Sequence, residues 1–200
     1  KFNGDVSAWD TSSATTMASM FNRTGRFNRY IGDWDVRNVT TFSKMFGDCV
    51  AFNQDLSKWD TSSATNMYRM FVTAENNWWS SYSGGIYSSN FDQDLGPKVC
   101  SRRDLTSPKY TSWNVSGVTD FRQMFAGHLQ NSSYYGVFNN GGSDSIQYWD
   151  TSGVTGNGFY QMFYRNGEFN QPLTSQTVTY TTLPDYTSWD VSGATDFRGM

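Results

Sequence analysis

The stretch that decides the fold is Phe52-Asn53-Gln54-Asp55-Leu56-Ser57-Lys58-Trp59-Asp60, followed by Thr65-Asn66-Met67-Tyr68-Arg69-Met70-Phe71. Nearly the same repeat motif, which we call the phrase, begins at Phe2 and at Phe27. As a result Trp9, Trp34 and Trp59 recur with a period of 25 residues. A fixed period of this size is typical of proteins whose repeats stack on their neighbours. The chain is therefore predicted to be one array of repeats without a single centre.

Three later copies keep the second half of the phrase, around Trp113, Trp149 and Trp189. Long insertions separate the parts of these copies, at about 72–90, 96–110, 126–145 and 174–186. The phrase thus defines six predicted repeats, at residues 2–26, 27–51, 52–90, 91–137, 138–168 and 169–200. Because a stacked array needs polar caps and the sequence starts and stops within a phrase, we expect a segment of a longer polypeptide.

The apolar residues of the first copy are spaced like those of an amphipathic helix, but the residues between them are Asn, Gly, Asp, Ser and Thr, which favour turns. We therefore predict a mainly β or irregular solenoid with short parallel strands, tight turns or 3-10 segments, and long loop insertions. In such a stack equivalent residues form columns that supply the core. The predicted tryptophan column is Trp9, Trp34, Trp59, Trp113, Trp149 and Trp189.

An acidic residue follows the tryptophan in five copies, and Asn114 takes its place in the sixth. Stacked carboxylates either accept hydrogen bonds from the next residues, as in an Asx-turn, or bind Ca²⁺ in pairs. Asn114 keeps the acceptor but lacks the charge, which favours the turn, and no metal site is predicted. The five acidic members are Asp10, Asp35, Asp60, Asp150 and Asp190.

The phrase at 52–71 closely resembles the repeat of 25 or 26 residues of bacterial surface proteins. That repeat occurs in mycoplasma and listeria surface lipoproteins and is related to the BspA-type leucine-rich repeats. Met45-Phe46-Gly47-Asp48-Cys49 also resembles the Phe-x-x-Cys corner of that family. The resemblance covers every part of the chain outside the insertions. It implies a leucine-rich-repeat-like solenoid, secreted or displayed at a cell surface for adhesion or assembly, with no catalytic residues.

Composition excludes several functions. With 16% charged residues and a net charge of −3, the chain lacks the basic surface that nucleic acid or anionic lipid requires. No apolar run is long enough to span a membrane, and the content of Ser, Thr, Asn, Gly and aromatic residues suits an extracellular setting. The only histidine, His128, has no nucleophile phrase or metal-ligand spacing around it, so neither an enzyme nor a cofactor is predicted. Cys49 and Cys100 are either free or joined in a disulfide.

The insertions are where binding would reside, because loops on a rigid scaffold often bind ligands. They are rich in aromatic residues among Ser, Gly and Asn, which either cover the flank of the stack or contact subunits or glycans. The candidate binding residues are Trp78, Trp79, Tyr82, Tyr87, Tyr134 and Tyr135. Four sequons are possible glycosylation sites, at Asn22, Asn38, Asn114 and Asn131.

Two insertions rejoin the repeat through similar sequences, Tyr110-Thr111-Ser112-Trp113 and Tyr186-Thr187-Ser188-Trp189, and are expected to leave from one edge. This edge suggests contact between subunits, and removing residues 97–108 is expected to weaken assembly. The predicted function is an extracellular structural or interaction protein for surface display, adhesion or assembly of a fibre or layer, as a possible homopolymer. The alternative is a monomeric carbohydrate-binding or host-binding adhesin.

Overall fold

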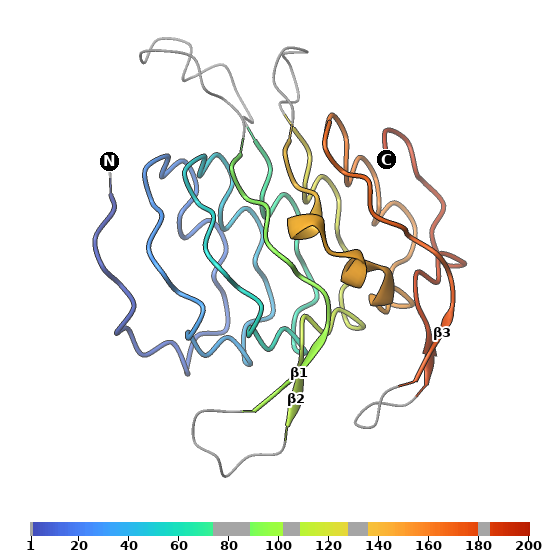
Figure 1. Cartoon of the computed structure of the whole chain (residues 1–200), viewed down its shortest axis with the longest axis horizontal. Coiled ribbons are helices and arrows are strands. Elements are labelled where there is room, and N and C mark those ends of the chain that lie inside the picture. Colours follow the sequence, from blue (N-terminus) through green and yellow to red (C-terminus); the bar gives the residue numbers. More distant parts are fainter. Residues whose placement is uncertain (1, 74–88, 102–108, 128–135, 180–184) are drawn as a thin grey trace.

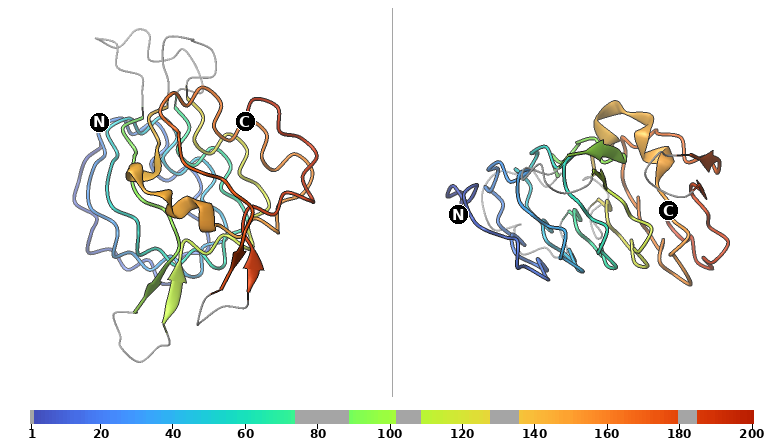
Figure 2. Two further views of the ribbon diagram at one scale, coloured as in Figure 1. Left: turned by 45° about the vertical axis from the view of Figure 1, so that its right-hand side comes forward. Right: turned by 90° about the horizontal axis from the view of Figure 1, so that it is seen from below.

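A computed structural model describes residues 2–73, 89–101, 109–127, 136–179 and 185–200. Two antiparallel hairpins are its only sheets in these ranges: β1 (Lys98–Cys100) pairs with β2 (Tyr110–Ser112), and β3 (Thr177–Val178) pairs with β4 (Tyr186–Thr187). Two 3-10 helices, η2 (Asn140–Gly142) and η3 (Asp144–Tyr148), are the helical elements of the described chain. The remaining backbone is irregular and is arranged as a row of loops from the N-terminus to the C-terminus (Figures 1 and 2).

Equivalent residues of successive repeats lie side by side in this row. The indole rings of Trp113 and Trp149 stack with centroids 6.3 Å apart, and those of Trp149 and Trp189 are 6.2 Å apart. Each indole also donates a hydrogen bond to a backbone carbonyl of the preceding repeat, as Trp59 Nε1 does to Ile31 O at 3.1 Å. Trp34, Trp113, Trp149 and Trp189 make the equivalent bonds, to Val6, Leu56, Leu95 and Ile146. The indole N–H groups of the buried tryptophans therefore all have hydrogen-bond acceptors, and their rings are packed.

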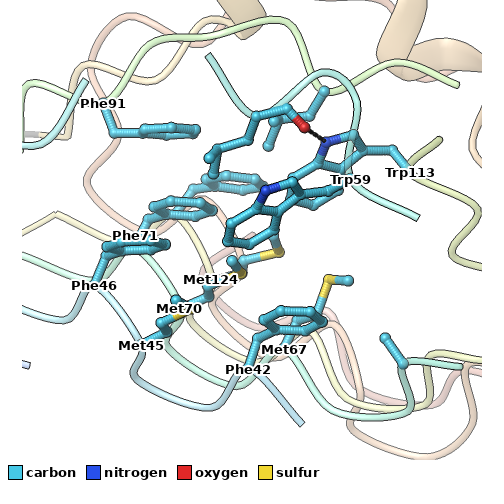
Figure 3. Packing of buried hydrophobic residues seen from close by; sticks show 14 of the residues in the cluster. Phe42, Met45, Phe46, Trp59, Met67, Met70, Phe71, Phe91, Trp113 and Met124 are labelled. Atoms are coloured by element: carbon cyan, nitrogen blue, oxygen red, sulfur yellow. Dashed lines mark hydrogen bonds between the residues drawn. The ribbon is translucent and has the colours of Figure 1, made fainter. Parts of the chain in front are cut away.

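Phenylalanine rings form the rest of the core, together with methionines (Figure 3). Phe46 and Phe52 stack at 4.0 Å between the end of one repeat and the start of the next. The same rings continue across repeats, with Phe46 and Phe71 5.4 Å apart and Phe52 and Phe91 5.9 Å apart. Offset stacking at these distances is favourable, so the core is an aromatic column without a single centre.

A row of asparagine and aspartate side chains fixes the register of the repeats. In the first five members the side-chain oxygen accepts a hydrogen bond from the backbone N–H of the equivalent residue in the next repeat, at 2.7 to 3.1 Å, and the sixth member donates the last of these bonds. Its members, which we call the Asn ladder, are Asn3, Asn28, Asn53, Asp92, Asn139 and Asn170. Side-chain ladders of this kind satisfy backbone groups that a parallel sheet would otherwise pair.

The prediction of a leucine-rich-repeat-like solenoid with short parallel strands is wrong. The only sheets in the described residues are the two antiparallel hairpins, and repeats meet through isolated parallel bridges such as Thr16 with Thr41. Backbone hydrogen bonds between repeats continue beyond these bridges, for example from Met17 N–H to Thr41 O and from Ser19 N–H to Ser43 O. Residues in this segment such as Lys44, with φ of 55°, and Arg69, with φ of 54°, have left-handed backbone, so the bonded segments are turns and not strands. Of the 3-10 helices, η2 lies in an insertion and η3 joins that insertion to Trp149, whereas residues 18–21 of the first repeat form turns.

Candidate functional site

Both hairpins stand on the repeats in the same way, projecting from one edge of the row of loops, the lower edge in Figure 1. The Tyr110 hydroxyl of β2 donates a hydrogen bond to Lys58 O, and the Tyr186 hydroxyl of β4 donates one to Tyr148 O, each at 2.5 Å. Ser112 and Ser188 join the strands at the base of each hairpin through their hydroxyls. Each hairpin is thus anchored by its tyrosine to the repeat that precedes it.

A recess of about 80 Å³ lies where the first hairpin, repeat 5 and the second hairpin meet. Repeat 5 has η3 before its tryptophan, where repeats 4 and 6 have hairpins, so a gap is left between the two hairpins. The recess is lined by Pro97, Thr111, Trp113, Asn114, Val115, Ser116, Tyr148, Asp150 and Tyr186.

One buried hydroxyl in the recess has no partner. Thr111 is 6% exposed, and among the described residues its Oγ1 makes no hydrogen bond. An unsatisfied buried hydroxyl costs about 1 to 3 kcal/mol, so its presence indicates a place where a ligand or an ordered water would bind.

Other polar groups of the recess retain bonding capacity. Asp150 Oδ1 accepts two hydrogen bonds from Ser152, and Asn114 Oδ1 accepts two from Ser116. The second carboxylate oxygen of Asp150 and the Asn114 amide nitrogen make no hydrogen bond within the described chain. Together with the rings of Tyr148 and Tyr186, they offer an acceptor, a donor and apolar faces, a combination that suits a sugar hydroxyl pair.

The aspartates after the tryptophans form turns, which confirms the Asx-turn interpretation. Ser12 donates to Asp10 from its backbone N–H at 3.0 Å and from its hydroxyl at 2.7 Å. These bonds, with the hydroxyl contributing most, lower the pKa of the Asp10 carboxyl. In the part of the chain that the structure describes, no three His, Cys, Asp or Glu side chains are grouped to bind a metal ion.

Several predicted site residues lie outside the described residues. They are Trp78, Trp79, Tyr82, Tyr87, Tyr134, Tyr135, the sequon Asn131 and His128. Among the other sequons, Asn38 is exposed but donates its amide to Ser12 O at 2.8 Å, Asn114 lines the recess, and Asn22 is half-buried in a turn.

Both cysteines are free. Cys49 is buried, its thiol points at the carbonyls of Thr24 and Phe27, and burial raises its pKa to about 12. Cys100 ends β1 and is half-buried. Of the two states that the sequence allows, the structure therefore has free thiols.

The sequence-based prediction did not identify the recess. Thr111 and Tyr186 belong to the recurring Tyr-Thr-Ser-Trp stretches, which showed that the insertions rejoin the repeats alike. Asn114 and Asp150 were explained as turn residues. The residue that could have indicated the recess is Tyr148. It directly precedes the tryptophan of repeat 5, where no hairpin is inserted, and so marks the gap between the two hairpins.

Comparison with known proteins gives one family. A family model described as "Mycoplasma protein of unknown function, DUF285" matches residues 1–82 and 101–200. No curated protein and no solved structure matches the chain. None of the helices in the described ranges is long and apolar enough to cross a membrane.

Proposed function

Since the chain belongs to the family of Mycoplasma proteins of unknown function, DUF285, whose model matches most of its length, we propose that it is an extracellular interaction protein of the cell surface. It acts in adhesion or in the assembly of a fibre or layer, and its repeats are of the surface-protein type that is related to BspA. Its composition, rich in Ser, Thr, Asn, Gly and aromatic residues, suits that setting.

The observation that supports assembly is the pair of anchored hairpins on alternate repeats. Val99 of β1 is 44% exposed, and within the described residues β1 pairs only with β2. An exposed strand edge is a template for pairing with another chain. Two such edges at the same point of repeats 4 and 6 give one side of the molecule a repeated contact surface.

Shortening both hairpins is expected to abolish assembly without unfolding the repeats. Removing 97–108 takes away β1, and removing 177–185 takes away β3, so the two deletions eliminate the exposed strand edges that the proposed contact uses. We expect the wild-type chain to form assemblies and the shortened chain to sediment as a monomer with an unchanged circular dichroism spectrum.

A matched control keeps each insertion at its full length but replaces 102–108 and 180–184 with Gly and Ser. All samples contain reductant, because Cys100 is half-buried and free. Assembly that persists in the shortened chain, or a wild-type chain that stays monomeric in sedimentation and in electron micrographs, would contradict the role of the hairpins.

A second candidate function is binding of a surface glycan, and the recess favours it. We expect single sugars to bind there weakly, with dissociation constants on the order of 1 mM. Thr111→Val removes the unpaired hydroxyl and keeps the shape, so binding should weaken about fivefold while stability stays equal or rises. The dissociation constants are measured by titrating the protein with a panel of monosaccharides and following the chemical shifts of its NMR resonances.

Thr187→Val is the matched control, because Thr187 occupies the equivalent place in the second hairpin and is exposed. It should leave sugar binding unchanged. Equal binding by both variants, or no shift of any line from the recess, would show that Thr111 only holds a water molecule.

A further inference from the structure

Each repeat has two consecutive residues between the apolar residues of its Met-Phe segment. In repeat 3 these are Tyr68 and Arg69, half-buried, between the fully buried Met67 and Met70. The equivalent pairs are Ala18 and Ser19, Ser43 and Lys44, Arg122 and Gln123, Tyr160 and Gln161, and Arg198 and Gly199. Gln123 is buried, at 7% exposed. The N-terminal pairs are small, whereas from Lys44 onward the positions hold cations, tyrosines and glutamines, except for Gly199.

We call six of these residues the Tyr/Arg row: Lys44, Tyr68, Arg69, Arg122, Tyr160 and Arg198. The first position reads Tyr68, Arg122, Tyr160 and Arg198 through repeats 3 to 6, so a ring alternates with a guanidinium. The phenylalanine rings beside them are 6.1 Å apart from Phe121 to Phe159 and 5.9 Å apart from Phe159 to Phe197. Successive repeats thus present one ring or one guanidinium at a spacing that is close to the length of one pyranose ring.

The rings and cations of the row touch each other. Arg69 and Arg122 place their guanidinium carbons 5.0 and 5.1 Å from the centre of the Tyr68 ring, and Lys44 Nζ is 5.8 Å from it. Arg198 lies 5.4 Å from the centre of the Tyr160 ring. Cation–π contacts at this range restrict the long side chains, which lowers the entropic cost of binding a ligand.

Hydrogen bonds link the second residues of the pairs in repeats 3 to 5. The Arg69 guanidinium donates to the Gln123 carbonyl oxygen, and the Gln123 amide donates to that of Gln161. All three residues have left-handed backbone, with φ of 54° to 56°, so the same turn directs each side chain. The second position therefore forms a continuous polar line through repeats 3 to 5.

Acidic residues lie beneath two of the guanidinium groups. Asp120 and Asp196 accept bidentate hydrogen bonds from Arg122 and Arg198. The carboxylates are 15% and 17% exposed, whereas the guanidinium side chains are 37% and 81% exposed. The outer surface of each pair is therefore cationic, although the chain as a whole has a net charge of −3.

We propose that the Tyr/Arg row binds a linear acidic polysaccharide in which charged and neutral sugars alternate. The carboxylate or sulfate groups of such a polymer pair with Arg122 and Arg198, because guanidinium and carboxylate geometries match. The apolar face of the intervening sugar packs on Tyr160, which lies between these two cations in the row. The row belongs to a different segment of the repeats from the hairpins, and this inference does not depend on the proposed assembly or on the recess.

The test measures binding of the full chain to hyaluronan oligosaccharides by calorimetry, with dextran as the uncharged polymer and polyphosphate as a polyanion without sugars. Hyaluronan alternates a uronic acid with a neutral amino sugar, as the row requires. Arg122→Gln with Arg198→Gln should weaken binding about tenfold or more, since charge-assisted hydrogen bonds are roughly twice as strong as neutral ones. Tyr160→Leu should weaken binding severalfold without changing the net charge.

The matched control is Arg26→Gln with Lys58→Gln, which removes the same charge outside the row. It should leave hyaluronan binding within about twofold at an ionic strength of about 0.15 M, where distant exposed charges are screened. Thermal unfolding of each variant checks the fold. Three results overturn the proposal: no binding of hyaluronan, equal loss in the control, or polyphosphate binding as tightly with no effect of Tyr160→Leu.

Discussion

Replacing Trp59 with alanine is expected to lower the free energy of unfolding by about 3 to 5 kcal/mol, the range for large-to-small changes at filled sites. Trp59 is completely buried, its ring stacks with Phe42 at 5.5 Å, and its Nε1 donates to Ile31 O. Truncation leaves a cavity between repeats and removes one of the two hydrogen bonds to Ile31 O, which still accepts from the Trp34 N–H. Urea unfolding followed by circular dichroism measures the loss.

Trp9 offers a control at the same position of the repeat. It is 52% exposed and stacks on Trp34 at 6.2 Å, so Trp9→Ala should cost only the aromatic pair, about 0.5 to 1.5 kcal/mol. Trp59→Phe should fall between the two, because it keeps a ring but loses the N–H donor. Similar losses for Trp59→Ala and Trp9→Ala would show that the tryptophan column does not hold the repeats together.

Alkaline pH is expected to destabilise the fold through Cys49. Burial raises the pKa of this thiol from its ordinary value of 9.0 to about 12, so the folded state favours the protonated form. The resulting stability is fully present below pH 9 and is lost as the pH rises toward 12. At about 1.4 kcal/mol per pH unit, the three units between these values give a loss of about 4 kcal/mol.

Comparison with Cys49→Ala isolates this effect, because lysine and tyrosine titrate in both proteins and cancel in the difference. Unfolding free energies are measured at intervals from about pH 8 to pH 12, with Cys100→Ala in both chains to prevent disulfides. The advantage of the wild type over Cys49→Ala should shrink steadily above pH 9. A difference that stays constant over this range would show that the thiol ionises without unfolding the site.

The sequence predicted the arrangement of side chains better than it predicted the backbone. A period of 25 residues requires equivalent residues to recur, and Trp59, Phe46 and Asn53 do contact their equivalents or the backbone of a neighbouring repeat. Regular strands were predicted because stacked repeats usually pair through parallel ladders. The repeats do exchange backbone hydrogen bonds, as Arg69 N–H does with Arg122 O, but Arg69 and its equivalents have left-handed backbone, so these segments are turns and not strands. The Asn ladder satisfies further N–H groups through side chains, and neither effect follows from hydrophobic spacing.

The candidate sites depended on features that no local pattern shows. The recess arises because repeat 5 has no hairpin between those of repeats 4 and 6, so it depends on three repeats at once. In the Tyr/Arg row, Tyr160 and Arg198 are 38 residues apart in the sequence and contact only because the intervening insertion leaves the stack in register. The alternation of tyrosine and arginine is nevertheless present in the sequence, at the same position in the second half of the phrase in repeats 3 to 6.

The Asn ladder has a consequence for how such genes change. Asn28 accepts from the repeat that follows and its own N–H donates to the repeat that precedes, so the two faces of a repeat such as 27–51 are complementary to each other. A recombination event that duplicates or deletes one whole unit of 25 residues rejoins the same donors to the same acceptors. Insertion or loss of one whole unit of 25 residues is therefore expected to be nearly neutral for folding.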